Sequence, residues 1–455
     1  MIVDAARVTA PGIPATPVLA RRIGFRDALA FGVPALLVLQ INAVGQLYVS
    51  ELALLAALPF LIYEARVTDG RRVPHLPIIL GLIWLFVQVE TDLYRGSTLV
   101  DYSRGWSKIA FTLTNFIALY LLLGASPRRF RLFAWGLVVG LLAQFYFRPD
   151  AYALLDPWKF GLAPPLTLAV VLLASRPRVY SLPLVAPALI VSMAIVNLAQ
   201  GFRSLAAICF VASGFSFVSA YGHRRAHRLG VPSPVKTLVL CACCVVAALG
   251  FMKVYEHAAH DGLLGSAAQV KYEQQVSGLG LILGGRPEMI ASLTAIRDSP
   301  IIGHGSWARD PKYVLLLNAE LEKYGLRPYD FQSGSSTALS DLIPEHSHLL
   351  GAWVEAGFFG TLFWFWALGL AIAVLSRLYL LRDRMTPLVA YLGLLLVWDI
   401  LFSPFGAERR LLIPYYLIVL LFTWDRLRGV VRRSRGASEP ESEVAPPEPE
   451  WEREL

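Results

Sequence analysis

Residues 345–361 read EHSHLLGAWVEAGFFGT, which places two histidines and two carboxylates at the start of a long apolar run. Ionisable groups are costly in lipid, so their presence at the edge of an apolar segment indicates a functional site. The stretch also ends the one large loop of an otherwise apolar chain. We therefore expect chemistry at a membrane surface.

The composition supports a membrane protein. Of the 455 residues, 56% are hydrophobic and only 16% are charged, with a mean hydropathy of +0.55. Soluble domains carry roughly 25% charged residues. The net charge of +8 does not indicate nucleic-acid binding, because the basic residues form short clusters between apolar runs, as topology signals do.

Twelve stretches are apolar and long enough to cross roughly 30 Å of hydrocarbon as helices, so we predict an all-α polytopic membrane protein. The spans are expected at residues 29–46, 49–65, 74–90, 108–124, 132–147, 160–175, 180–200, 203–221, 235–252, 348–376, 387–403 and 410–425.

Arginine clusters assign the orientation of these spans. With the N-terminus in the cytoplasm, every inside segment carries at least two arginines, whereas the short outside loops carry fewer. This register predicts the bacterial inner membrane, with residues 253–347 as a periplasmic loop between the ninth and tenth spans. The expected organisation is a cytoplasmic segment, nine spans, the loop, three spans and a disordered tail, at residues 1–28, 29–252, 253–347, 348–425 and 426–455.

Two other features narrow the class. All four cysteines, Cys209, Cys241, Cys243 and Cys244, fall inside expected spans, which argues against a disulfide framework or a zinc site. A secondary transporter often has two related halves. Here the long loop follows span nine, which breaks such symmetry and favours an enzyme at the outer leaflet.

The loop contains an expected anion site. Apolar residues at helical spacing predict a surface helix over residues 287–298, with Pro287 in its first turn. Gly303 and Gly305 allow a tight turn around His304. Arg286 stands just before the helix N-terminus, where a guanidinium beside free backbone N–H groups attracts anions. An ordinary surface arginine is the alternative interpretation.

Residues 341–361 supply the candidate base. His346 and His348 lie two positions apart and should face different directions on a helix. An interfacial histidine is a good general base, and either Glu345 or Glu355 could orient it. His348 is the rival base. No third ligand has metal-site spacing, so neither a metal nor another cofactor is expected.

Further cations are expected at the same outer face. Arg203 stands at the outer end of span eight, Lys159 precedes span six, and Arg148 lies eleven residues before Lys159. A cationic pocket at the outer leaflet indicates a lipid substrate that bears phosphate.

The combined motifs resemble the bacterial O-antigen ligase and polymerase family. His346, Ser347, Gly357, Gly360 and Thr361 match its signature, and Glu355 matches the acidic residue before the first glycine. Arg203 in GFRSL and Arg286 in GGRPEMIASLTAIRDSPIIGHG resemble its two arginines. The likeness extends in order over residues 160–425.

The resemblance implies an inverting, metal-independent glycosyltransferase. Its donor would be a glycan on undecaprenyl pyrophosphate at the periplasmic leaflet, and its acceptor a sugar hydroxyl of the lipid A core or of a second lipid-linked glycan. The expected catalytic residues are His346, Arg203 and Arg286; Lys159, Arg148, Glu355 and His348 are expected to bind substrate.

Four functional hypotheses remain open: a ligase, a polymerase, a transporter and a non-catalytic scaffold. Ser347 and Thr361 resemble the ligase form of the signature, which favours an O-antigen ligase over a polymerase of O-antigen or exopolysaccharide repeats. A transporter of lipid-linked sugars should carry paired charges deep in several spans, and a non-catalytic scaffold would not need converging arginines and a histidine. Membrane lipids are expected to surround the protein, and no nucleic-acid partner is expected.

Overall fold

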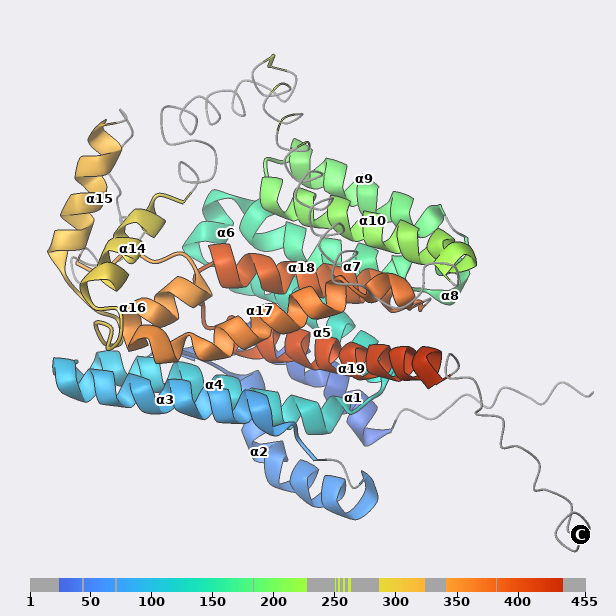
Figure 1. The fold of residues 1–455 in the computed structure, drawn as a ribbon, viewed down its shortest axis with the longest axis horizontal. Coiled ribbons are helices and arrows are strands. Elements are labelled where there is room, and N and C mark those ends of the chain that lie inside the picture. The colour runs from blue at the N-terminus through green and yellow to red at the C-terminus, as the bar shows by residue number, and fades with distance from the viewer. Residues whose placement is uncertain are drawn as a thin grey trace, which may run out of the picture.

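The computed structural model is almost entirely helical, with one short two-stranded hairpin (Figure 1). It describes residues 24–42, 45–69, 72–182, 184–226, 286–323, 341–381 and 383–436, together with residues 250, 253, 257, 261 and 262. The expected ninth span and much of the expected loop lie outside the described residues.

The described residues from 24 to 226 form a series of helices and one hairpin. Its elements are α1 (Phe25–Ala35), η1 (Leu36–Val38), β1 (Gln40–Asn42), β2 (Gln46–Tyr48), α2 (Val49–Glu64), η2 (Ala65–Asp69), α3 (His75–Arg95), α4 (Leu99–Leu123), α5 (Pro127–Phe147), α6 (Ala151–Leu155), η3 (Pro157–Leu162), α7 (Ala163–Ala174), α8 (Pro177–Tyr180), α9 (Val185–Ala199) and α10 (Arg203–Ala226).

The C-terminal half places two short helices before the last apolar ones. Its elements are α14 (Glu288–Asp298), α15 (Pro311–Lys323), α16 (His348–Gly360), α17 (Leu362–Leu375), η5 (Leu378–Leu380), α18 (Thr386–Phe402) and α19 (Arg409–Gly436). In Figure 1, α14, α15 and α16 gather at one end of the bundle.

Within the described residues, five helices are long and apolar enough to cross a membrane: His75–Arg95, Leu99–Leu123, Pro127–Phe147, Pro157–Ala174 and Leu362–Leu380. Three further apolar helices are shorter, at Val185–Ala199, Arg203–Ser219 and Thr386–Phe402. These lengths fit an all-α membrane protein without establishing twelve spans.

Helix α3 has the burial pattern expected in lipid. Its large apolar side chains at Leu82, Phe86 and Leu93 are exposed, whereas the polar Gln88 and Asp92 are buried against other helices. In water such a pattern would be unfavourable, but lipid tails solvate the apolar face while the protein interior supplies partners for the polar one.

Three expected boundaries were wrong. Span 29–46 is interrupted, because α1 ends at Ala35 and the chain then forms the β1–β2 hairpin. Span 348–376 is two helices, since Gly357 leaves the helical conformation at φ 68°. The last helix does not end near residue 425 but continues to Gly436, so the start of the expected disordered tail is helical.

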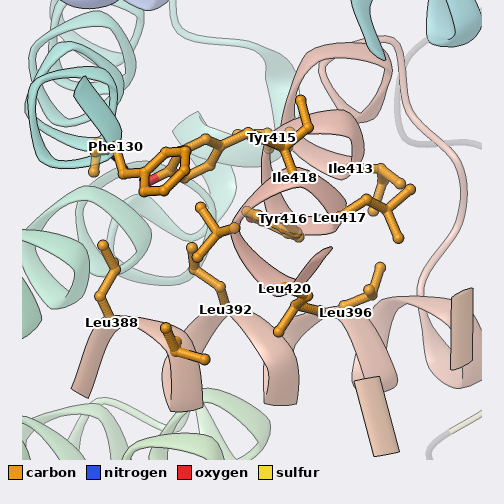
Figure 2. Close-up of a cluster of buried hydrophobic side chains, with 14 of the residues drawn as sticks. Phe130, Leu388, Leu392, Leu396, Ile413, Tyr415, Tyr416, Leu417, Ile418 and Leu420 are labelled. Atoms are coloured by element: carbon orange, nitrogen blue, oxygen red, sulfur yellow. Dashed lines mark hydrogen bonds between the residues drawn. The ribbon is translucent and has the colours of Figure 1, made fainter. Parts of the chain in front are cut away.

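The core lies where α18 and α19 pack beside α5 (Figure 2). Leu392 and Leu396 of α18 face Leu420 of α19 across this contact, and all three are fully or almost fully buried. Tyr415 stacks on Phe133 at 4.6 Å between ring centroids and donates its hydroxyl to the Phe130 carbonyl at 2.8 Å. This contact satisfies a buried hydroxyl as well as filling space.

A buried ion pair joins helix α2, near the start of the chain, to helix α19, near its end. Arg410 at the start of α19 donates two hydrogen bonds of 2.7 Å to the Glu51 carboxylate of α2, and Asn115 of α4 donates to the Arg410 carbonyl at 3.0 Å. The two-pronged geometry compensates for removing both charges from water.

Candidate functional site

Helix α14 positions Arg286 at the bundle end. The expected helix over residues 287–298 is confirmed as Glu288–Asp298, with Pro287 as its N-cap residue. Arg286 donates from Nε to the Phe402 carbonyl at 3.1 Å, which ties the start of α14 to the C-terminal end of α18. The guanidinium is thus held at the border between the helical bundle and the loop.

Arg203 and Lys159 reach the same region from other elements. Burial lowers the pKa of Arg286; the carboxylate of Glu288 opposes this shift, and the positive charge of Arg203, the first residue of α10, adds to it. Lys159 in η3 is held locally, because the Asp156 side chain accepts its backbone N–H at 3.0 Å. Its charge acts on His346.

His346 lies among these cations. Burial, then Arg286 and Lys159, lower its pKa to about 3, so the imidazole is neutral at pH 7. Its Nδ1 lies 3.9 Å from Oε1 of Glu288, and its side chain is 29% exposed. The structure therefore brings together His346, Arg286, Arg203 and Lys159, four residues that are far apart in the sequence.

The extended segment before α16 directs successive side chains to two different sites. Ser347 is extended, with φ −154° and ψ 135°, so neighbouring side chains alternate in direction. His346 points toward Glu288, while Glu345 and Ser347 line a small cavity inside the bundle. Ser347 also caps α16 by accepting from Leu350 N–H at 3.1 Å, and donates to the Ile400 carbonyl at 2.7 Å.

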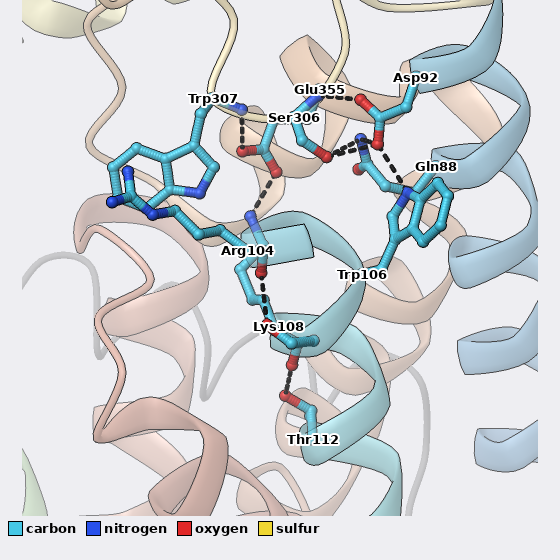
Figure 3. A network of polar contacts seen from close by, with 10 residues as sticks. Gln88, Asp92, Arg104, Trp106, Lys108, Thr112, Ser306, Trp307 and Glu355 are labelled. Atoms are coloured by element: carbon cyan, nitrogen blue, oxygen red, sulfur yellow. Dashed lines mark hydrogen bonds and ion pairs between the residues drawn. The ribbon is translucent and has the colours of Figure 1, made fainter. Parts of the chain in front are cut away.

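Glu355 does not lie beside His346. Its carboxylate pairs with Lys108 of α4, and it accepts the backbone N–H of Trp307 at 3.2 Å (Figure 3). Both carboxylate oxygens are thereby engaged, and the side chain is only 3% exposed. Glu355 joins α4, α16 and the loop before α15, and it is not placed to orient the imidazole of His346.

His348 and Arg148 also lie apart from the cationic group. His348 is buried, with Nδ1 2.7 Å from the Ser403 carbonyl and its ring against Trp364 and Phe405 at 5.0 Å. The two histidines do face different directions, as expected. Arg148 follows α5 and donates to the Gln40 carbonyl of the hairpin at 2.9 Å.

The loop before α15 is fixed to α3 by Asp92. This buried carboxylate accepts the backbone N–H and the hydroxyl of Ser306, both at 2.6 Å, and the indole N–H of Trp106 at 2.8 Å (Figure 3). The expected turn around His304 is confirmed, because Gly303 and Gly305 have φ of 86° and 90°.

The loop also completes broken helix α16. The N–H groups of His304 and Gly305 donate to the carbonyls of Val354 and Glu355 at 2.7 and 3.0 Å, and Phe358 N–H donates to the Pro300 carbonyl at 3.0 Å. These bonds replace those lost at Gly357. A Cβ there would lie 1.8 Å from the Ile301 carbonyl oxygen, so only glycine permits this approach.

Sequence reasoning missed Glu288 and Lys108. Glu288 has a visible signal, since it stands two residues after Arg286 in the same loop motif. Lys108 is a lone charge at the edge of an apolar run, which is itself a sign of a specific partner.

Among the described residues, no group of three or more histidine, cysteine or acidic side chains is arranged to hold a metal ion. The expectation of a metal-independent reaction stays a prediction. No protein-family model, curated protein or solved structure matches the chain.

Proposed function

We propose that this protein is an inverting membrane glycosyltransferase that moves a glycan from undecaprenyl pyrophosphate to an acceptor sugar hydroxyl. The favoured assignment is an O-antigen ligase with the lipid A core as acceptor. The proposal includes twelve spans in the bacterial inner membrane and a site that faces the periplasm. It depends on one observation: two cations from separate segments, Arg286 and Lys159, act on a neutral imidazole, and a third, Arg203, acts on Arg286.

The cations suit a pyrophosphate leaving group. When the bond between the anomeric carbon and the pyrophosphate oxygen breaks, its electron pair goes to that oxygen. Arg286, Arg203 and Lys159 offset the resulting negative charge. One well-placed donor of this kind contributes several kcal/mol to transition-state stabilisation, typically about 3–4 kcal/mol.

His346 suits proton removal from the acceptor. The acceptor oxygen forms a bond to the anomeric carbon from the face opposite the leaving group, and its proton passes to the imidazole. General base catalysis of this kind contributes about 10²–10⁴-fold. A base must be neutral to act, and burial, together with Arg286 and Lys159, keeps His346 neutral.

The same cations would make His346 a weak base in the empty site. A bound pyrophosphate beside Arg286 and Lys159 offsets their charge and raises the pKa of His346. The donor would thereby activate the base that the next step needs. Catalysis would follow donor binding, and the empty enzyme would be inert toward the acceptor alone.

A reconstituted transfer assay tests the site. His346→Ala should lower kcat by about 10²–10⁴-fold, and Arg286→Ala and Arg203→Ala should also lower turnover. His257→Ala and Arg297→Ala are the matched controls, because both side chains are exposed and lie outside the proposed site. Near-normal turnover in all three site variants would overturn the mechanism.

Deletion of the gene separates the hypotheses. Loss of all O-chain from lipid A, with lipid-linked polymer retained, supports the ligase. A single repeat attached to the core indicates a polymerase, and unchanged lipopolysaccharide with lost exopolysaccharide indicates a polymerase of another pathway. Failure to move lipid-linked sugar across the membrane would favour a transporter.

A further inference from the structure

A small cavity lies on the inner side of the segment that carries His346. Its walls include Trp84 of α3, Lys108 of α4, Glu345, His348 of α16, and Trp364 of α17. Pro404 and Phe405, between α18 and α19, also line it, so four helices and two loops converge on the cavity. His346 itself does not line this cavity.

Four polar atoms in these walls have no hydrogen-bond partner within the described part of the chain. They are the indole Nε1 of Trp84, Oε2 of Glu345, Nε2 of His348 and the indole Nε1 of Trp364. Trp84 and His348 are each 2% exposed and Trp364 is 0% exposed. Buried polar atoms almost always have a partner, either protein or ordered water. Finding four around one cavity therefore indicates a shared polar ligand.

The chemistry of the walls defines that ligand. The indoles can only donate. His348 Nδ1 lies 2.7 Å from a carbonyl oxygen, which can only accept, so Nδ1 carries the proton and a neutral ring presents Nε2 as an acceptor. A small molecule that both donates and accepts satisfies this set, and the narrow cavity excludes a sugar ring. Water meets both conditions.

Glu345 shares this cavity with Lys108, whose ammonium pairs with a second carboxylate, Glu355, that is not part of the cavity wall. Lys108 is paired with Glu355, so Glu345 is left beside an ion pair that is already complete. A Cβ at Gly351 would lie 2.5 Å from Oε2 of Glu345, so glycine makes the space in which the carboxyl sits. Burial, and then the charge of Glu355, raise the pKa of Glu345 to about 8 against the opposing effect of Lys108.

Glu355 and Lys108 are the charged groups that act on Glu345, and the other ionisable groups nearby act on its neighbours. His348 of α16 is neutral in the tautomer described above. Asp92 of α3 acts on Lys108, and Arg409 of α19 acts on His348. The α17 wall is formed by the uncharged Trp364. The local balance is therefore set by one ammonium and two carboxyl groups.

We propose that this cavity is a buried water site, in which water joins the Trp84, His348 and Trp364 nitrogens to the side chain of Glu345. Because Lys108 already pairs with Glu355, the Glu345 side chain beside this pair is a neutral carboxylic acid. Loss of its proton would place two carboxylates beside Lys108 and disturb the segment that positions His346. Glu345 is thus a positioning residue. The water site itself does not depend on the proposed glycosyl transfer.

Infrared difference spectroscopy on the full-length protein in lipid nanodiscs tests the proposal. Wild-type protein should show a protonated carboxyl C=O band at pH 7 that is lost as the pH rises through about 8. Glu345→Gln should remove this band, whereas Glu322→Gln, on the exposed face of α15, should keep it. A band that persists in Glu345→Gln, or is absent from wild type, would overturn the assignment.

The same pH-difference spectra test for water. An O–H stretch that shifts on exchange into H₂¹⁸O, and that is missing from the Glu345→Gln spectra, supports bound water; no such shift refutes it. The thermal midpoint gives a second readout, because a carboxyl with a raised pKa loses stability as pH rises from about 4.5 to about 8. Between about pH 6.5 and 8, where His346 no longer contributes, Glu345→Gln should flatten that slope, and an unchanged slope counts against the proposal. None of these readouts requires transferase activity.

Discussion

Lys108→Met should destabilise the protein strongly, because it removes the cation from a buried pair. The Glu355 carboxylate is 3% exposed and the Lys108 side chain 15% exposed, so the remaining carboxylate would stay buried with only the Trp307 N–H as a partner. Removing one member of such a pair costs about 3–5 kcal/mol. At about 2 °C per kcal/mol, the low end for large soluble domains, the thermal midpoint should fall by roughly 6–10 °C.

The assay is thermal unfolding of the purified protein in detergent, followed by intrinsic tryptophan fluorescence. The double variant Lys108→Met/Glu355→Gln should recover much of the loss, since it leaves no unpaired charge. Lys312→Met is the matched control. Lys312 also pairs with a carboxylate, Asp298, but its side chain is 58% exposed, so the midpoint should barely move. Equal shifts for Lys108→Met and Lys312→Met would refute the reasoning.

Three further predictions concern the broken helix and the histidine. Gly357→Ala should lower the free energy of unfolding by at least about 1–3 kcal/mol, because φ is 68° there and a Cβ would meet the Ile301 carbonyl. Gly369→Ala is the control. Nothing lies within 4 Å of a Cβ at that position, so the variant should be neutral or stabilising in the same thermal unfolding assay. His346 should make the thermal midpoint fall as pH drops below about 6.5, because unfolding frees its imidazole to take up a proton that the folded site, with its pKa near 3, rejects. Glu345 acts in the opposite direction above about pH 4.5, so the slope that tests His346 is measured below about pH 4.5, where Glu345 is protonated in both states. His346→Gln should reduce that slope and the exposed His257→Gln should not; equal slopes would contradict the assignment. In the transfer assay, the acid limb of kcat should lie at higher pH than that of kcat/KM, since donor binding raises the pKa of His346; coincident limbs would argue against activation by the donor.

Local patterns predicted those parts of the site that depend on neighbours in sequence. The helix before His304 and the glycine turn around it follow from short-range rules of periodicity and backbone freedom. His346 and His348 do face different directions, but His346 precedes α16 in an extended segment, so the expectation that both lie on one helix was wrong. The prediction failed at residues 29–46, because it relied on the mean hydropathy of the segment. It gave too little weight to Asn42, which favours turns, and to the polar Gln40 and Gln46, all three of which lie in the hairpin.

Side-chain partners that are distant in the sequence could not be predicted from such local patterns. Lys108 and Glu355 are 247 positions apart, and nothing in either local pattern specifies that pairing. The sequence marked Glu355 as a candidate partner of His346, whereas the nearby carboxylate is Glu288. Gly357 matched the family signature, but nothing in the local pattern indicated that it admits the backbone of the loop at Ile301.

The loop contribution to α16 has a consequence for biogenesis. The proposed topology places α16 in the bilayer, where unsatisfied carbonyls at Val354 and Glu355 would carry a desolvation cost with no water at hand. The amides that relieve it belong to residues 304 and 305, which leave the ribosome first. The amides of residues 304 and 305 are therefore synthesised before the carbonyls of α16 that need them. A circular permutant that reversed this order should insert poorly into the membrane, even though every native contact would still be available.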